Sequence, residues 1–234
     1  MSYRLFEGKD HASIYQKYRI TPPEELKNII LQYLDTKKGQ PHVLAVDLGC
    51  GTGQNSRLLA PNFQEVVGID ISECQLEEAR AVPGYSNITY RKGTAEELQF
   101  PDGSVDLLTA ASAAHWFDQS RFLAEVKQIL MPYTSSPVGV ADGKLEELYR
   151  AIPFPDKERI ESILVNCPIS VMNLVGFIQS WSMFQAYHKK DPQTAENLLL
   201  STQKRFLEVM GVTSPDTELE WQMEYFCVLA SKPR

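Results

Sequence analysis

A run of apolar residues closed by three glycines on alternate positions most constrains how this chain can fold. The run extends from Val43 to Leu48, with one acid at Asp47, and Gly49, Gly51 and Gly53 follow it. Glycine tolerates positive φ, and without a side chain it lets a ligand lie against the backbone. The pattern predicts a buried parallel strand that runs into a tight, ligand-binding turn.

The residues after the turn extend this interpretation. Residues 54–60 predict a helix whose free N–H groups point at whatever occupies the turn. A second apolar run, Val66 to Ile71, contains Asp70 seventeen positions after Gly53. In doubly wound α/β sheets, an acid at the tip of the second strand accepts hydrogen bonds from a ribose diol. The sequence therefore predicts a ligand that contains adenosine.

The glycine spacing bears on which ligand this is. The dinucleotide fingerprint is G-x-G-x-x-G, whereas this chain has G-x-G-x-G with Asp47 two residues before the first glycine. An acid there would repel a pyrophosphate but would suit an ammonium group, directly or through water. A nucleotide-dependent oxidoreductase is therefore disfavoured, and a glycine-rich turn without any ligand is the plain alternative.

This stretch resembles the S-adenosylmethionine (SAM) site of class I methyltransferases, whose pattern is D-x-G-x-G-x-G with a later acid. The segment from Phe100 to Leu108 is similar to the family's F-x-D-x-S-F-D-x-V, and His115-Trp116 resembles the branch that includes trans-aconitate methyltransferase-like small-molecule enzymes. The resemblance implies an α/β fold: a Rossmann-like, mostly parallel sheet with helices on both faces, an antiparallel last strand and a helical cap insertion.

The resemblance also implies a cofactor and its contacts. SAM would be the cofactor and S-adenosylhomocysteine (SAH) the product. The implied cofactor-binding residues are Asp47, Gly49, Gly51, Gly53, Asp70, Ile71, Thr94, Ala95, Glu96 and Ala111.

Four further residues are candidates on the acceptor side. His115 and Trp116 follow the fourth strand, and ligands in α/β sheets bind outside the carboxyl ends of strands. Tyr18 and Arg19 lie in an N-terminal segment that folds over the ligand in similar enzymes. Ordinary packing is the alternative for His115 and Trp116. A surface arm held by its tyrosines is the alternative for Tyr18 and Arg19. His115 is the candidate catalytic residue, since a hydroxyl or amine acceptor would need a base whereas a carboxylate would not.

We expect the acceptor to be a small carboxylic acid that is methylated on its carboxylate oxygen. The planar fork of an arginine matches a carboxylate in two-point contact, so Arg19 is expected to orient the acid together with His115. The similarity to a branch with such substrates also favours this acceptor.

The expected organisation is one methyltransferase domain over residues 1–234. Within it, residues 1–40 would form an N-terminal lid and helix, and residues 41–131 the SAM-binding core. Residues 144–212 would form a helical cap, and residues 217–231 the closing strands.

The chain departs from the family pattern at residues 131–143. Serine, proline and glycine dominate there and predict a loop, whereas the family has an apolar fifth strand beside the fourth. Without that strand the fourth strand would keep an open edge. The resemblance thus implies either a shortened variant or a gap that residues 138–141 fill poorly. It leaves two functions open: an active small-molecule methyltransferase, or a catalytically impaired protein of this fold that acts as a binding partner.

Composition limits the partners. The net charge of −7 argues against nucleic acid and anionic membranes, both of which attract basic proteins. The four cysteines lack C-x-x-C spacing, which favours reduced thiols over a zinc site or disulfides. No apolar run approaches the roughly 20 residues of a membrane helix. We expect a cytoplasmic monomer or weak dimer that binds a small-molecule substrate and no metal.

Overall fold

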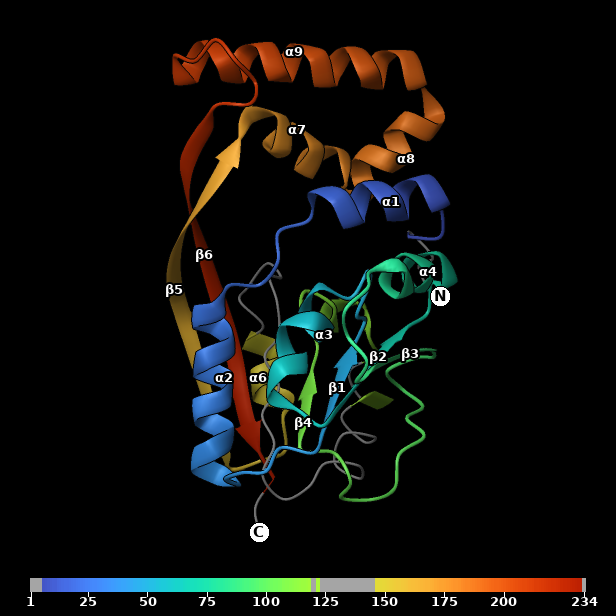
Figure 1. Ribbon diagram of the computed structural model, residues 1–234, viewed down its shortest axis with the longest axis vertical. Coiled ribbons are helices and arrows are strands. Elements are labelled where there is room, and N and C mark those ends of the chain that lie inside the picture. Colours follow the sequence, from blue (N-terminus) through green and yellow to red (C-terminus); the bar gives the residue numbers. More distant parts are fainter. Residues whose placement is uncertain (1–5, 119–120, 123–145, 233–234) are drawn as a thin grey trace. The chain divides into compact units, whose positions relative to one another are not determined.

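The computed structural model describes residues 6–118, 121–122 and 146–232 (Figure 1). The chain divides into two compact units. Unit 1 combines Met1–Ile20 with Val165–Met223, and unit 2 combines Thr21–Leu164 with Glu224–Arg234.

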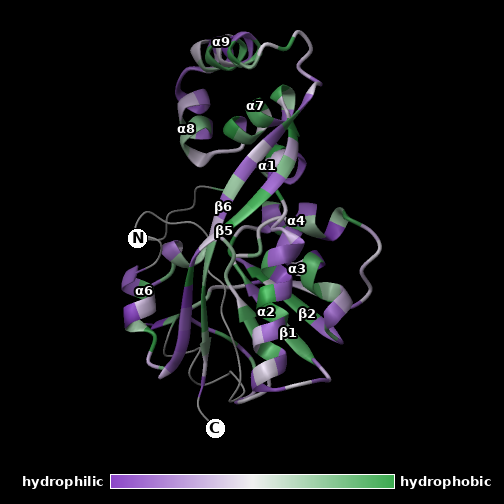
Figure 2. Ribbon diagram, turned by 90° about the vertical axis from the view of Figure 1, so that its left-hand side faces the viewer, coloured by the Kyte–Doolittle hydropathy of each residue, from purple (hydrophilic) through white to green (hydrophobic). Residues whose placement is uncertain are grey.

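A parallel sheet of four strands forms the centre of unit 2, in the order β3-β2-β1-β4. The strands are β1 (Leu44–Leu48), β2 (Glu65–Asp70), β3 (Ile88–Lys92) and β4 (Leu107–Thr109). In β1, Val46 pairs with Val67 of β2 on one side and with Leu108 of β4 on the other. Figure 2 shows β1 and β2 as largely hydrophobic, as expected for strands buried on both faces. The predicted Rossmann-like sheet is confirmed.

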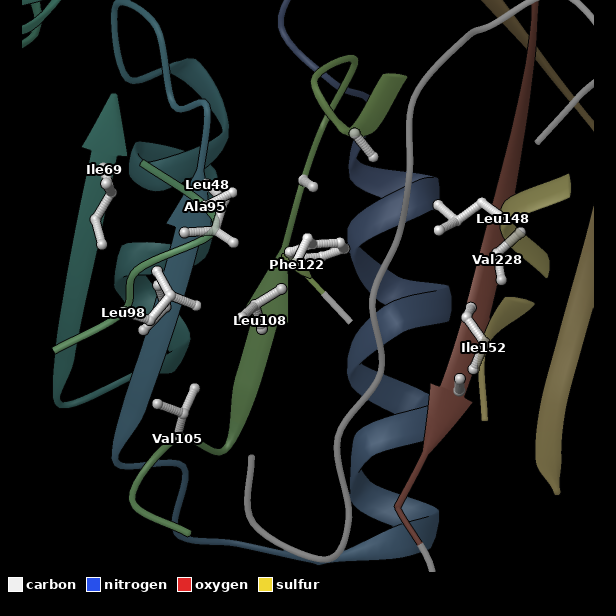
Figure 3. Close-up of a cluster of buried hydrophobic side chains, with 14 of the residues drawn as sticks. Leu48, Ile69, Ala95, Leu98, Val105, Leu108, Phe122, Leu148, Ile152 and Val228 are labelled. Atoms are coloured by element: carbon white, nitrogen blue, oxygen red, sulfur yellow. The ribbon is translucent and has the colours of Figure 1, made fainter. Parts of the chain in front are cut away.

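Helices and core residues cover both faces of this sheet. The first face packs against α2 (Glu24–Lys37) and α3 (Gln54–Leu59), where Ile30, Leu34 and Leu59 meet Ala45 and Leu107. The short helix η1 (Ala60–Asn62) follows α3, and α4 (Glu73–Ala81) packs on β2 and β3. The opposite face carries the cluster drawn in Figure 3, which includes Leu48, Leu108, Phe122, Val228 and Leu148 of α6 (Glu146–Ala151).

The last strands form a separate two-stranded antiparallel sheet, β5 (Asp156–Ser170) and β6 (Glu218–Ser231). Successive side chains of β6 enter opposite clusters: Val228 joins the core that contains Leu108, and Leu229 joins the core that contains Leu107. Because strand side chains alternate between faces, the end of β6 lies in the same layer as β4. Among the described strands, β4 pairs with β1 alone. The departure expected at 131–143 lies outside the described residues.

Unit 1 is largely helical. It contains α1 (Lys9–Tyr18), α7 (Val171–Gln179), α8 (Ser182–Lys190) and α9 (Pro192–Met210). Ser170 caps α7 by accepting from the N–H of Asn173, and Asp191 caps α9 by accepting from the N–H of Thr194. Gly211 ends α9 in the left-handed conformation at φ +67°.

The secondary structure within two of the expected segments differs in type or number from the expectation. Residues 144–212 were expected to form a helical cap, yet Asp156–Ser170 is a 15-residue strand. This segment contains the β-branched residues Ile160 and Ile163, which pack on the core of unit 2 beside α2, and extended pairing with β6 satisfies its backbone. The closing strands expected over 217–231 are a single continuous strand, Glu218–Ser231.

Candidate functional site

The glycine turn between β1 and α3 is held in a left-handed backbone conformation. Its φ angles are +62° at Gly49, +54° at Gly51 and +84° at Gly53, all in a region that disfavours residues with a Cβ. The N–H of Cys50 donates to the carbonyl of Ile69 (3.1 Å), which ties the turn to the end of β2. The turn therefore lies at the carboxyl ends of β1 and β2, where ligands bind in this fold class.

Asp47, the acid before the turn, is engaged inside the protein. Its side chain is 1% exposed. One carboxylate oxygen accepts from Asn55 (2.7 Å) and Thr109 (2.8 Å), and the other accepts from Ser56 (2.7 Å). Burial raises the pKa of Asp47, and the three hydrogen bonds oppose that rise. The carboxylate thus joins β1 to α3 and β4, and we assign it a positioning role for the turn.

Asp70, the second acid, has free acceptor capacity. Its two carboxylate oxygens accept the N–H groups of Gly51 (2.9 Å) and Ser72 (2.8 Å). Burial raises the pKa of Asp70, and these backbone hydrogen bonds lower it. The backbone of Ile71 also hydrogen-bonds this carboxylate. A carboxylate has about four acceptor positions, so one remains for a ribose hydroxyl. The neighbouring Ile71 is 38% exposed and offers an apolar surface. This arrangement fits the ribose and purine of an adenosine.

The protein's own side chains require two of the three glycines of the turn. A Cβ on Gly49 would lie 2.5 Å from the Cβ of Ala113, and a Cβ on Gly53 would overlap the hydroxyl of Tyr90. The ring of Tyr90 also fills the space where Gly68 would carry a side chain, 2.7 Å from that position. Burial raises the pKa of Tyr90 to about 12. Tyr90 was not among the site residues expected from the sequence. Its ring supports the turn by packing against Gly53 and Gly68.

A second loop, residues 111–118, adjoins the glycine turn from the end of β4. Ala113 touches Gly49, as described, and the N–H of Asp118 donates to a carboxylate oxygen of Glu96 (2.8 Å). The short helix η2 (Ala114–Trp116) lies between these two anchor points. The loop therefore connects the glycine turn with the segment after β3.

His115 and Trp116 are presented by this loop on its solvent side. Trp116 is 47% exposed, and the centroids of the two rings are 4.7 Å apart. Burial lowers the pKa of His115 below its usual value, so the imidazole is neutral at pH 7 and has one donor and one acceptor nitrogen. The two rings therefore offer an accessible aromatic surface on this loop.

The other expected cofactor residues differ in their environment. Thr94 is exposed and lines a cavity of about 280 Å³ together with Ile69 and Phe100. Ala95 is buried in the core, and Ala111 is half-buried. Glu96 reaches the loop 111–118 through the hydrogen bond to Asp118. The structure thus gathers the expected cofactor residues of unit 2 around the ends of its four strands.

Tyr18 and Arg19 belong to unit 1. The ring of Tyr18 packs directly on Gly176 of α7. The guanidinium of Arg19 lies over the rings of Tyr15 (4.6 Å) and Phe177 (5.2 Å), and it makes no ion pair with a described residue. Their expected roles at the ligand remain predictions.

Two features are absent from the described residues. No cluster of three or more metal-ligating side chains occurs there. No helix in the same residues has the length and apolar character to cross a bilayer.

Parts of this chain are similar to known methyltransferases. Residues 46–133 match the family model described as a methyltransferase domain. The chain is 40% identical over 116 residues to a putative methyltransferase of Dictyostelium discoideum, which covers 50% of this chain and 41% of that protein. It is 33% identical over 126 residues to trans-aconitate 2-methyltransferase of Deinococcus radiodurans, which covers 53% of this chain and 45% of that enzyme.

The solved structure of a putative type II methyltransferase from Anaeromyxobacter dehalogenans shares the fold, with a TM-score of 0.67 and 22% identity over 93% of this chain and 100% of that one. The matches span less than half the length of the two curated relatives. The match to the family model covers the glycine turn, both acids and the loop after β4. Residues 46–133 are thus similar to a methyltransferase domain, and the chain shares the fold of a putative methyltransferase.

Proposed function

We propose that this protein binds SAM at the glycine turn and transfers its methyl group to a small-molecule acceptor. The observation that carries the proposal is Asp70, which combines backbone anchoring with a remaining acceptor position at the tip of β2. Asp70 would hold the ribose, Ile71 the purine, and Thr94 with Ala95 the far side of the adenine. Asp47 would act indirectly by fixing the turn.

SAM supplies a methyl group activated by a sulfonium. The protein's share of such an in-line displacement is alignment and the exclusion of water. The loop 111–118 supports this task because it is attached to the glycine turn through Ala113 and to the segment after β3 through Glu96. His115 and Trp116 would then contact the acceptor.

The proposed acceptor is a small carboxylic acid. One carboxylate oxygen forms the new bond to carbon, the bond between carbon and sulfur breaks with its electron pair on sulfur, and no proton is released. A neutral His115 suits this reaction, because it can donate a hydrogen bond without placing a full positive charge beside the attacking oxygen. Similarity to trans-aconitate 2-methyltransferase over about half of this chain supports the same class.

Binding of SAM is tested with Asp70→Ala. The variant should bind SAM more weakly by about 1.5–3 kcal/mol, the range of a hydrogen bond to a charged group. Asp102→Ala, which removes an exposed acid from the turn before β4, is the matched control and should bind like the parent. Isothermal titration calorimetry with SAM and SAH measures both. Unchanged affinity in Asp70→Ala would refute the placement of the ribose.

Methyl transfer is tested with labelled SAM and a panel of di- and tricarboxylic acids, alcohols, amines and thiols. Label in base-labile methyl esters is the expected result, and Arg19→Ala in the same assay tests the expectation made for that residue. Label confined to amines or thiols would refute the carboxylate acceptor. Tight SAM binding with no transfer to any class would instead support the catalytically impaired binding protein.

A further inference from the structure

Ser112 has an unusual backbone conformation at the end of β4. Its φ is +51°, and among the described residues no other non-glycine residue has a positive φ. A residue with a Cβ is strained in the left-handed region, which glycine visits freely. Strain of this kind persists where the surrounding structure imposes it and is concentrated at functional sites.

No internal contact explains why a serine occupies this strained position. Ser112 is exposed, whereas Ala113 and Ala114 directly after it are buried. Its hydroxyl makes no hydrogen bond to any described residue. A structural role would be filled better by glycine, so the side chain itself is what remains to be explained.

The surroundings of Ser112 indicate what the hydroxyl can contact. Ala113 packs on Gly49 of the cofactor turn, and the loop then continues into His115. The left-handed turn therefore presents a neutral hydroxyl at the carboxyl end of β4, next to the glycine turn and three residues before a neutral imidazole. Ligands of this fold class bind at the carboxyl ends of the strands.

We propose that Ser112 contacts the methyl acceptor and orients it by donating a hydrogen bond to the carboxylate oxygen that is not methylated. This inference rests on the proposed function. A neutral donor holds the second oxygen in place while the attacking oxygen keeps its electron density. In this proposal, Ser112 keeps its strained αL conformation because that conformation directs the hydroxyl to the acceptor.

Two substitutions separate the hydroxyl from the strain. Ser112→Ala removes the hydroxyl and keeps the strained backbone, whereas Ser112→Gly removes both. Ser86→Ala, which changes an exposed serine in the connection between α4 and β3, is the matched control. The melting temperature of Ser112→Gly should equal or exceed that of the parent. SAM affinity, measured by calorimetry, should stay within about twofold of the parent in all three variants.

The acceptor readouts should fall in both Ser112 variants. We expect kcat/KM for carboxylic acids to decrease about 10- to 100-fold, the scale of one hydrogen bond to a charged group. Binding of the same acids to SAH-loaded protein, followed by calorimetry, should weaken in parallel. Equal kcat/KM in the parent and Ser112→Ala, or a loss in Ser112→Gly alone, would overturn the proposal. Failure of all acids to bind the SAH-loaded parent would overturn it too, whereas failure of SAM binding would refute the proposed function itself.

Discussion

The glycine turn and the loop after β4 adjoin each other, yet they are built in opposite ways. Buried side chains hold the turn in place. The Asp47 carboxylate accepts three hydrogen bonds, and the ring of Tyr90 fills the space behind Gly53. The loop presents Ser112, His115 and Trp116 outward. Changes in the turn should therefore alter folding and cofactor binding together, whereas changes in the loop should alter catalysis while the fold persists.

Asp47→Ala should give the largest effect. It removes an acceptor and leaves Asn55, Ser56 and Thr109 as buried donors, each of which costs 1–3 kcal/mol when unsatisfied. We expect the free energy of unfolding to fall by about 3–5 kcal/mol in urea denaturation. Because burial raises the pKa of Asp47, its ionisation disfavours the folded state as pH rises through that pKa, and this pH dependence should disappear in the variant. A loss below about 1 kcal/mol would contradict the structural role.

Gly49→Ala should give the next largest effect. The new Cβ would meet Ala113 at 2.5 Å in addition to the strain of φ +62°. Together these should cost about 2–4 kcal/mol and weaken SAM binding, because the loop must move away from the turn. Gly103→Ala is a matched control, with φ +67° and nothing within 4 Å of the added Cβ. Equal losses in the two variants would show that backbone strain alone is responsible.

His115 should affect the pH profile and leave stability nearly unchanged. Its pKa is lowered by burial, so the imidazole stays neutral until pH falls below the usual value of 6.5. Protonation would place a cation beside the attacking carboxylate and slow transfer. We expect the acidic limb of kcat/KM to lie below pH 6.5 in the parent and to be absent in His115→Gln. A limb at or above pH 6.5, or one that persists in the variant, would contradict this role.

The sequence predicted the sheet and the glycine turn because their signals are local. The apolar run before Gly49, the alternate glycines and the acid at Asp70 all depend on neighbours in the chain. Contacts that depend on the pairing of distant segments were not predicted. Tyr90 is the clearest case: it lies beside Gly68 in the register of β2 and β3, and nothing in the local sequence gives that register.

The extended segment Asp156–Ser170 was missed for a related reason. Its partner, β6, begins 48 residues after it ends, so no local pattern revealed the pairing. The internal partners of Asp47 were not predicted either. Its three partners come from α3 and β4, which only the fold brings together.

The position of Tyr90 also limits the order in which the sequence around the turn can change. Gly53 and Gly68 lie 15 positions apart in the chain. The ring of Tyr90 occupies the space that a side chain would need at either position. A side chain at either position is excluded while the ring is present, and removal of the ring leaves a void behind the turn. Substitutions at these three sites are therefore energetically coupled, and their effects will not add. A series of single substitutions that replaces Gly53 or Gly68 would have to replace Tyr90 first.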